Sequence, residues 1–260
     1  MSVDIKIELT GESKVNARGV TVHRVRALVD IPSAGVKAND LGGWVESLTL
    51  RDGEARVSGE AWVSDEAQVF GEAQVSGRAR VYGRAQASGR ARVYDEARVY
   101  DGAWVYGDAQ VSGRARVYGR ARASGRARVY GDAQVYGDAQ VYGDAQVYGD
   151  AQVYGDAQVY GEARVESRTH WIAVGPIGSE GVTATLARTG DAHGHVLVVG
   201  CWTGTLDTLM AEVNRRRKLW GVDDATQRLW TDQYKALRKL GRVTVASWSA
   251  NSTTEKKEER

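Results

Sequence analysis

Four histidines and one cysteine are the side chains of this 260-residue chain best suited to acid–base or nucleophilic chemistry: His23, His170, His193, His195 and Cys201. A histidine can act as the general base of an acyltransferase. Three converging histidines can hold zinc, and a thiolate beside a histidine can act as a nucleophile. Each site requires a fold that brings its side chains together, so the elements that carry these residues decide which chemistry is open.

A repeated hexamer fills the middle of the chain and contains none of these five residues. Alanine recurs at every sixth position from Ala55 to Ala163, which gives 19 units over residues 53–166. Valine usually follows each alanine by two positions, and glycine or aspartate precedes it by two. Alanine and valine two apart point to one side of a strand, and glycine permits a tight turn. Each hexamer therefore predicts a short strand and a corner.

A longer period predicts how many corners make a coil. Ser76–Tyr94 and Ser112–Tyr130 agree at all but one position when one is shifted onto the other by six hexamers, or two coils of three hexamers. Charges three hexamers apart also alternate in sign, as in Glu72, Arg90, Asp108, Arg126 and Asp144. Strands of neighbouring coils lie about 4.8 Å apart, so these charges would attract each other. We therefore expect a three-sided column with eighteen residues per coil and an interior of alanine and valine.

An aliphatic residue with a small residue two positions before it resembles the hexapeptide-repeat left-handed parallel β-helix. This resemblance implies the hand of the coil, which the spacing does not give. The flanking stretches LGGWVES and GCWTGTLDTL resemble phage- and prophage-encoded repeat proteins labelled polymer-forming or transferase-like. The expected fold is mainly β: a left-handed parallel β-helix with an N-terminal β cap and a small C-terminal α+β module.

The open ends of such a column require caps. Residues 1–52 are the expected N-terminal cap, with strands at Ile5–Leu9 and Val20–Ile31 and with Leu41–Ser47 leading into the first coil. Residues 167–250 are the expected C-terminal module, and residues 251–260 are an expected disordered tail. The elements predicted for the module are strands at His170–Pro176, Val182–Arg188, His195–Trp202 and Arg242–Trp248, and helices at Thr205–Arg217 and Asp224–Leu240.

Catalysis is disfavoured by where the reactive residues lie. All four histidines stand outside the array, and no inserted loop interrupts it to form a site. An acyltransferase remains the first alternative function. His193 and His195 lack a third ligand, so we expect no metal, and we expect no cofactor or catalytic residue. Cys201 is expected to be a small buried residue in a strand.

Nucleic-acid binding is the second alternative, and the charge balance disfavours it. The array holds 14 arginines against 16 aspartates and glutamates, a net charge of −2, within a chain of net charge +2. We expect tyrosines one coil apart to form a stacked column and Trp62 and Trp104 to project outward. The candidate interaction surface comprises Trp62, Trp104, Arg80, Arg98, Arg116, Arg122, Tyr118, Tyr136, Tyr154 and Trp202.

Five identical units, GDAQVY from Gly131 to Tyr160, indicate that position along the array matters little. This tolerance suits a non-catalytic scaffold that binds a protein partner or itself, with specificity in the C-terminal module. A single cysteine and the absence of a long apolar run predict a cytoplasmic protein that does not enter a membrane.

Overall fold

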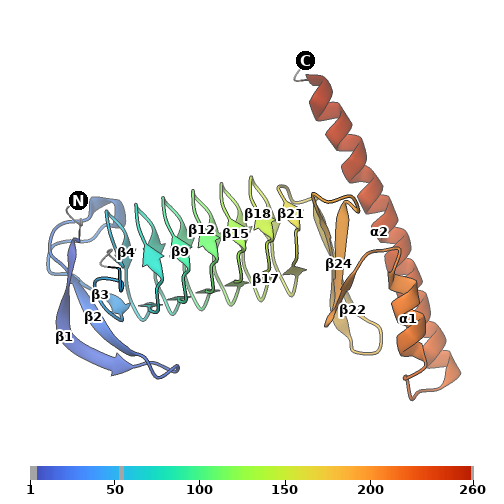
Figure 1. Ribbon diagram of the computed structural model, residues 1–260, viewed down its shortest axis with the longest axis horizontal. Coiled ribbons are helices and arrows are strands. Elements are labelled where there is room, and N and C mark those ends of the chain that lie inside the picture. The colour runs from blue at the N-terminus through green and yellow to red at the C-terminus, as the bar shows by residue number, and fades with distance from the viewer. Residues whose placement is uncertain (1–4, 53–55, 259–260) are drawn as a thin grey trace.

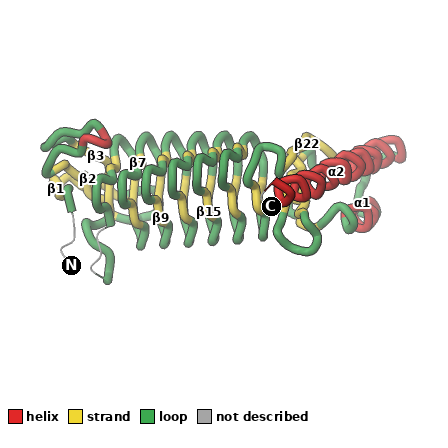
Figure 2. The backbone as a smooth tube through the Cα atoms, turned by 90° about the horizontal axis from the view of Figure 1, so that it is seen from above, coloured by secondary structure: helices red, strands yellow, loops and turns green. Residues whose placement is uncertain are grey.

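A row of stacked coils, closed at each end by a small cap, forms the body of the molecule in the computed structural model (Figure 1). The structure describes residues 5–52 and 56–258. The predicted start of the array at Gly53 lies outside these residues. Seen from above, the coils follow one another at a regular spacing between the caps (Figure 2).

The N-terminal cap is an antiparallel sheet of β1 (Ile7–Val15), β2 (Thr21–Ala27) and β3 (Leu41–Val45), with a 3-10 turn at Pro32–Ala34. β3 also pairs in parallel with the first strand of one wall of the array, Trp44 beside Gln68 and Val45 beside Val69. These partners are separated by one hexamer more than a coil. Coil stacking thus begins before residue 53, the predicted start of the array.

Three parallel sheets form the walls of the array, because every third strand stacks in the same sheet. Wall 1 extends the sheet of the cap and consists of β5 (Gln68–Val69), β8 (Gln86–Ala87), β11 (Trp104–Val105), β14 (Arg122–Ala123), β17 (Gln140–Val141) and β20 (Gln158–Val159). Wall 2 consists of β4 (Trp62–Val63), β7 (Arg80–Val81), β10 (Arg98–Val99), β13 (Arg116–Val117), β16 (Gln134–Val135) and β19 (Gln152–Val153). Wall 3 consists of β6 (Gln74–Val75), β9 (Arg92–Val93), β12 (Gln110–Val111), β15 (Arg128–Val129), β18 (Gln146–Val147) and β21 (Arg164–Val165).

The register confirms that three hexamers make one coil. Trp104 pairs with Arg122 on one side and with Gln86 on the other, each three hexamers away in the sequence. The Trp104 amide donates to the Ala121 carbonyl at 2.9 Å. From Ala67 to Val165 the inward alanine and valine side chains have no exposed surface. The array is therefore filled along its axis, as its alternating pattern predicts.

Corners hold the coils together through backbone geometry and charge. The corner glycines have positive φ, and Asp65, Asp95 and Asp101 adopt φ of +56 to +59° in their place. Asp95 Oδ2 accepts a hydrogen bond from the Gly113 amide one coil away at 3.1 Å. The predicted ion pairs also form, each from an arginine to the acid one coil later: Arg78–Glu96, Arg90–Asp108, Arg114–Asp132, Arg120–Asp138 and Arg126–Asp144.

The C-terminal module places a four-stranded antiparallel sheet over the last coil and two helices behind that sheet (Figure 1). Its elements are β22 (Trp171–Ile177), β23 (Val182–Arg188), β24 (His195–Val199), β25 (Trp202–Gly204), α1 (Leu209–Arg217) and α2 (Asp224–Glu258). Trp171 Nε1 donates to the Gln152 carbonyl at 2.8 Å, and the Gln158 amide donates to Thr185 Oγ1 at 2.9 Å. Otherwise unpaired groups of the terminal coil therefore find partners in the cap.

The predicted strand at Arg242–Trp248 is wrong, because these residues belong to α2. Gly241 lies against the Leu206 and Leu186 side chains, and Trp248 Nε1 donates to the Thr169 carbonyl at 2.6 Å. Tertiary packing thus overrides the β-branched local sequence. α2 also continues to Glu258, into the segment where we had expected disorder. No helix in the described ranges is long and apolar enough to cross a membrane.

Cys201 also departs from expectation. It is exposed, in the turn between β24 and β25, rather than buried within one long strand. Gly200, with φ of +57°, breaks the predicted strand. The Cys201 sulfur lies 3.6 Å from Arg216 Nη2, and no contact with His195 places a base beside it within the described structure.

Candidate interaction surface

Three arginines stack directly on one another along wall 2. Arg98 pairs in register with Arg80 on one side and with Arg116 on the other. They face outward because they stand between the inward alanine and valine of each hexamer. Across the described residues none of the three makes an ion pair or a side-chain hydrogen bond. Wall 2 therefore carries a row of uncompensated positive charge.

Wall 3 shows that this stacking is not imposed by the repeat. Its outward row alternates glutamine and arginine, so that Arg92 lies between Gln74 and Gln110, and Arg128 lies between Gln110 and Gln146. Like charges directly opposite each other destabilise neighbouring strands. Wall 2 therefore contains a like-charge repulsion between stacked arginines, whereas wall 3 separates its arginines with glutamines.

A column of tyrosine rings runs beside the arginine row. Its rings stack with centroids 4.8 to 5.4 Å apart: Tyr82, Tyr100, Tyr118, Tyr136 and Tyr154. The last ring meets Trp171 of the cap edge-on at 5.2 Å. The predicted column is confirmed, and it continues into the C-terminal module. Offset and edge-on arrangements of this kind are the favourable ones for aromatic rings.

The tyrosines also lean over the outward residue of the next coil. Tyr118 Oη donates to Gln134 Oε1 at 3.4 Å, and at the equivalent place beside Tyr82 stands Arg98. Burial raises the pKa of Tyr82, and the positive charge of Arg98 partly opposes this rise. The two rows form one continuous surface, the Arg–Tyr strip: Arg80, Arg98, Arg116, Tyr82, Tyr100, Tyr118, Tyr136 and Tyr154.

The strip unites six of the ten residues of the predicted surface. Trp62 shares the arginine row but is only 6% exposed, because the N-terminal cap covers it and a Cβ on Gly42 would lie 3.0 Å from its ring. The expectation of an exposed Trp62 is therefore wrong. Trp202 is half-buried, packs over Gly204 and belongs to the apolar core of the C-terminal module rather than to the strip.

Trp104 and Arg122 lie together on wall 1, away from the strip. Trp104 is half-buried, since the guanidinium of Arg18 lies 4.0 Å from its ring centroid. Its Nε1 donates to Ser88 Oγ at 3.0 Å, and the Tyr106 ring lies 4.2 Å away. The turn of the β1–β2 hairpin therefore covers this tryptophan, and nothing in the periodicity of the array indicates that contact.

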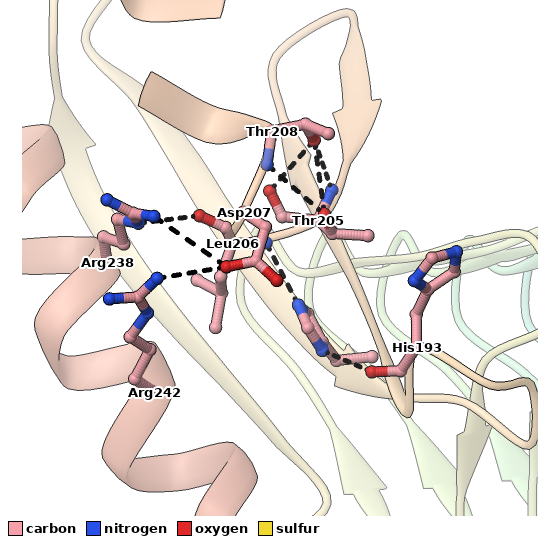
Figure 3. Close-up of polar contacts among 8 residues, drawn as sticks. His193, Thr205, Leu206, Asp207, Thr208, Arg238 and Arg242 are labelled. Atoms are coloured by element: carbon pink, nitrogen blue, oxygen red, sulfur yellow. Dashed lines mark hydrogen bonds and ion pairs between the residues drawn. The ribbon is translucent and has the colours of Figure 1, made fainter. Parts of the chain in front are cut away.

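His195, a candidate base on its residue type, is engaged at both ring nitrogens. Its Nδ1 donates to the His193 carbonyl at 2.8 Å, and its Nε2 accepts the Leu206 amide at 3.0 Å. The His193 ring itself points away from this cluster (Figure 3). Beyond Leu206, Asp207 forms an ion pair with Arg242 at 3.1 Å (Figure 3). These contacts give His195 the role of fixing the chain where it enters α1.

The other histidines are placed in similar structural settings. His170 Nδ1 accepts the Glu166 amide at 3.3 Å, and its Nε2 lies 3.2 Å from Arg188 Nη1. His23 is half-buried on β2, opposite Val45. Across the part of the chain that the structure describes, no cluster of three or more histidines, cysteines or acids could hold a metal ion.

The array matches the family model described as the YdcK beta solenoid repeat, at residues 73–89, 91–107, 109–125, 121–137, 133–149, 139–155 and 145–161. The first three matches each begin one coil after the previous one. Later matches begin two hexamers or one hexamer apart. No curated protein matches the chain. The likeness lies in the array and not in the caps, and it supports a β-solenoid repeat protein.

Proposed function

We propose that this chain is a non-catalytic scaffold whose Arg–Tyr strip and C-terminal module bind a protein partner. The observation that carries the proposal is the stack of Arg80, Arg98 and Arg116 without a carboxylate partner in the described structure. Natural sequences commonly retain destabilising features where binding requires them. A binding role explains why the like-charge repulsion is retained, although selection for stability alone would remove it.

The chemistry of the strip favours a partner with an acidic surface. Arginine and tyrosine are enriched at protein interfaces, where guanidinium groups bind carboxylates in a bidentate manner. The strip ends at the C-terminal module, since Tyr154 contacts Trp171. One partner can therefore contact both the rod and the module, which also exposes Leu240 and Val243 on α2.

Finer features of the proposal come from the resemblance of the sequence. We take the coil to be a left-handed hexapeptide-repeat helix, the gene to be phage- or prophage-borne, and the site of action to be the bacterial cytoplasm. For the acyltransferase alternative, His195 and His170 are weaker candidates for the base, because both ring nitrogens of each are engaged.

The test is a quantitative pull-down from bacterial lysate with two matched full-length variants. Arg98→Gln/Arg116→Gln removes two charges from the strip, and Arg92→Gln/Arg128→Gln removes two from equivalent positions of wall 3. The proposal expects one or more partners to be lost, by about tenfold or more, only with the first variant, as loss of charged hydrogen bonds predicts. Equal retention by both variants, or equal loss, contradicts a binding role for the strip.

A further inference from the structure

A cleft of about 530 Å³ lies between the turn of the β1–β2 hairpin and wall 1. Asn16 fixes that turn, since its Oδ1 accepts the amides of Arg18 at 2.9 Å and Val20 at 3.0 Å. The Arg18 guanidinium lies over the Trp104 ring, with its central carbon 4.0 Å from the ring centroid. Stacking of this kind orients the guanidinium while leaving its N–H edges free to donate.

Among the described residues, four arginines and no carboxylate line the cleft: Arg18, Arg84, Arg120 and Arg122. Arg120 pairs with Asp138 at 2.7 Å. In the described structure, Arg84 and Arg122 make neither an ion pair nor a side-chain hydrogen bond. The cleft is therefore strongly positive within an array whose total charge is negative.

A break in the repeat creates this imbalance. In the ladder of corners, the residue one coil after Arg84 is Gly102, whereas the residues one coil after Arg114, Arg120 and Arg126 are aspartates. The corner at Asp101–Gly102 reverses the usual order of glycine and acid, and Asp101 instead points to the Gly119 amide at 3.4 Å. Glu66, on the other side of Arg84, is bound by Lys14 of β1. Arg84 therefore has no acid at the position one coil later, and the acid one coil earlier is already paired with Lys14.

Two of the residues that line the cleft carry buried polar atoms without a partner in the described structure. Asn16 Nδ2 and Gln68 Oε1 are buried and have no hydrogen-bond partner among the described residues. Buried polar groups are nearly always satisfied. One of these atoms is a donor and the other an acceptor, so the selectivity of the cleft for an anion comes from its four guanidinium groups.

We propose that this cleft binds a small molecule that carries two or more phosphate groups. Its volume is in the range typical of small-molecule sites. Arg84 and Arg120 stand two coils apart, or about 9.6 Å at the usual strand spacing, which suits phosphates at both ends of a compact ligand. Each guanidinium group presents parallel N–H donors whose fork geometry matches the oxygens of a phosphate.

The surroundings favour a compact ligand over a nucleic-acid strand. Along the same corner ladder the positive charge ends at Asp138 and Asp156, and along wall 1 it ends at Gln140 and Gln158. A polyanionic chain needs a basic track that extends along its backbone. Along wall 1 and this corner ladder the basic residues are confined to the cleft.

Isothermal titration with tripolyphosphate tests the site, using the full-length protein. The proposal expects saturable one-to-one binding that weakens at least tenfold in Arg122→Gln. Arg128→Gln is the matched control, because Arg128 stands at the same hexamer position on wall 3, outside the cleft, and it should bind as the wild type does. Gly102→Asp restores the carboxylate that the ladder lacks, and it should abolish binding; because its Cβ would lie 3.2 Å from the Gly119 carbonyl oxygen, circular dichroism must show that this variant is folded.

Four results overturn the proposal. One is the absence of saturable tripolyphosphate binding at low salt. Another is an equal loss in Arg122→Gln and Arg128→Gln, which would indicate general charge attraction. The third is tighter binding of a single-stranded oligonucleotide than of tripolyphosphate with the same dependence on Arg122, which would assign the cleft to nucleic acid. The fourth is a Gly102→Asp protein that is folded and binds normally, which contradicts the charge argument.

Discussion

Replacing the middle arginine of the strip should make the protein more stable. In Arg98→Gln, two like-charge contacts disappear, with Arg80 and with Arg116. At a strand spacing of about 4.8 Å, each pair repels by about 0.9 kcal/mol in water. Physiological salt, with a Debye length of about 8 Å, reduces each repulsion to roughly half. The free energy of unfolding is therefore expected to rise by about 1 kcal/mol, and by less where the arginine side chains splay apart.

The assay is urea or thermal unfolding followed by circular dichroism at low, physiological and high salt. Arg92→Gln is the control, since its neighbours Gln74 and Gln110 carry no charge and its removal relieves no stacked repulsion. The gain of Arg98→Gln over Arg92→Gln should shrink to a few tenths of a kcal/mol at about 1 M salt, where the Debye length is about 3 Å. If Arg98→Gln is no more stable than the control at low salt, or if its added stability does not depend on salt concentration, the stacked arginines do not repel one another as we infer.

Three further predictions concern the corners and the C-terminal cap. Gly125→Ala should lower the free energy of unfolding by about 2–3 kcal/mol and Gly155→Ala by only about 1–2 kcal/mol. Both glycines have φ of +64°, but of the two only a Cβ at Gly125 meets the next coil, 3.0 Å from the Gly143 nitrogen. Equal melting temperatures of the two variants would contradict the close stacking of corners. Hydrogen bonds from Arg215 and then Arg216 lower the pKa of Glu212 from 4.5 to about 2, so the stability they supply should be complete above pH 4.5 and vanish towards pH 2. The free energy of unfolding of the wild type minus that of Glu212→Gln should be about 1 kcal/mol larger above pH 4.5 than near pH 2, and a difference that stays constant across this range refutes the assignment. Trp171→Phe should cost about 1–3 kcal/mol in thermal unfolding, because the Gln152 carbonyl loses its donor; an unchanged melting temperature contradicts the role of this contact in closing the rod.

The periodicity of the array made its architecture predictable. Alanine and valine alternate inward from Ala67 to Val165, with alanine in place of valine only at Ala87 and Ala123, so that one local rule specifies the strands, the corners and the coil of three hexamers. The Tyr82–Tyr154 column and the corner ion pairs follow from the same period, because they depend only on residues one coil apart.

Contacts between distant segments were not predictable in this way. Trp62 and Trp104 occupy outward positions in their hexamers, and only the folded N-terminal cap covers the first and places Arg18 on the second. Residues 242–248 alternate like a strand, yet Gly241 and Trp248 pack as parts of α2. The stacked arginines could have been found from the sequence by comparing walls 2 and 3, whereas the cleft required the hairpin turn to be in place.

Lengthening the run of identical hexamers tests the stacked architecture most directly. Three additional GDAQVY units within Gly131–Tyr160 leave every pair of residues one coil apart chemically unchanged, because the run is uniform. Spin labels on Cys201 and on Ala38→Cys, both exposed, report the separation of the two caps by pulsed electron resonance. The account predicts a folded protein whose caps move apart by about 4.8 Å along the rod, one strand spacing, with their relative orientation retained. An unfolded protein, an unchanged separation, or a shift of several strand spacings would contradict it.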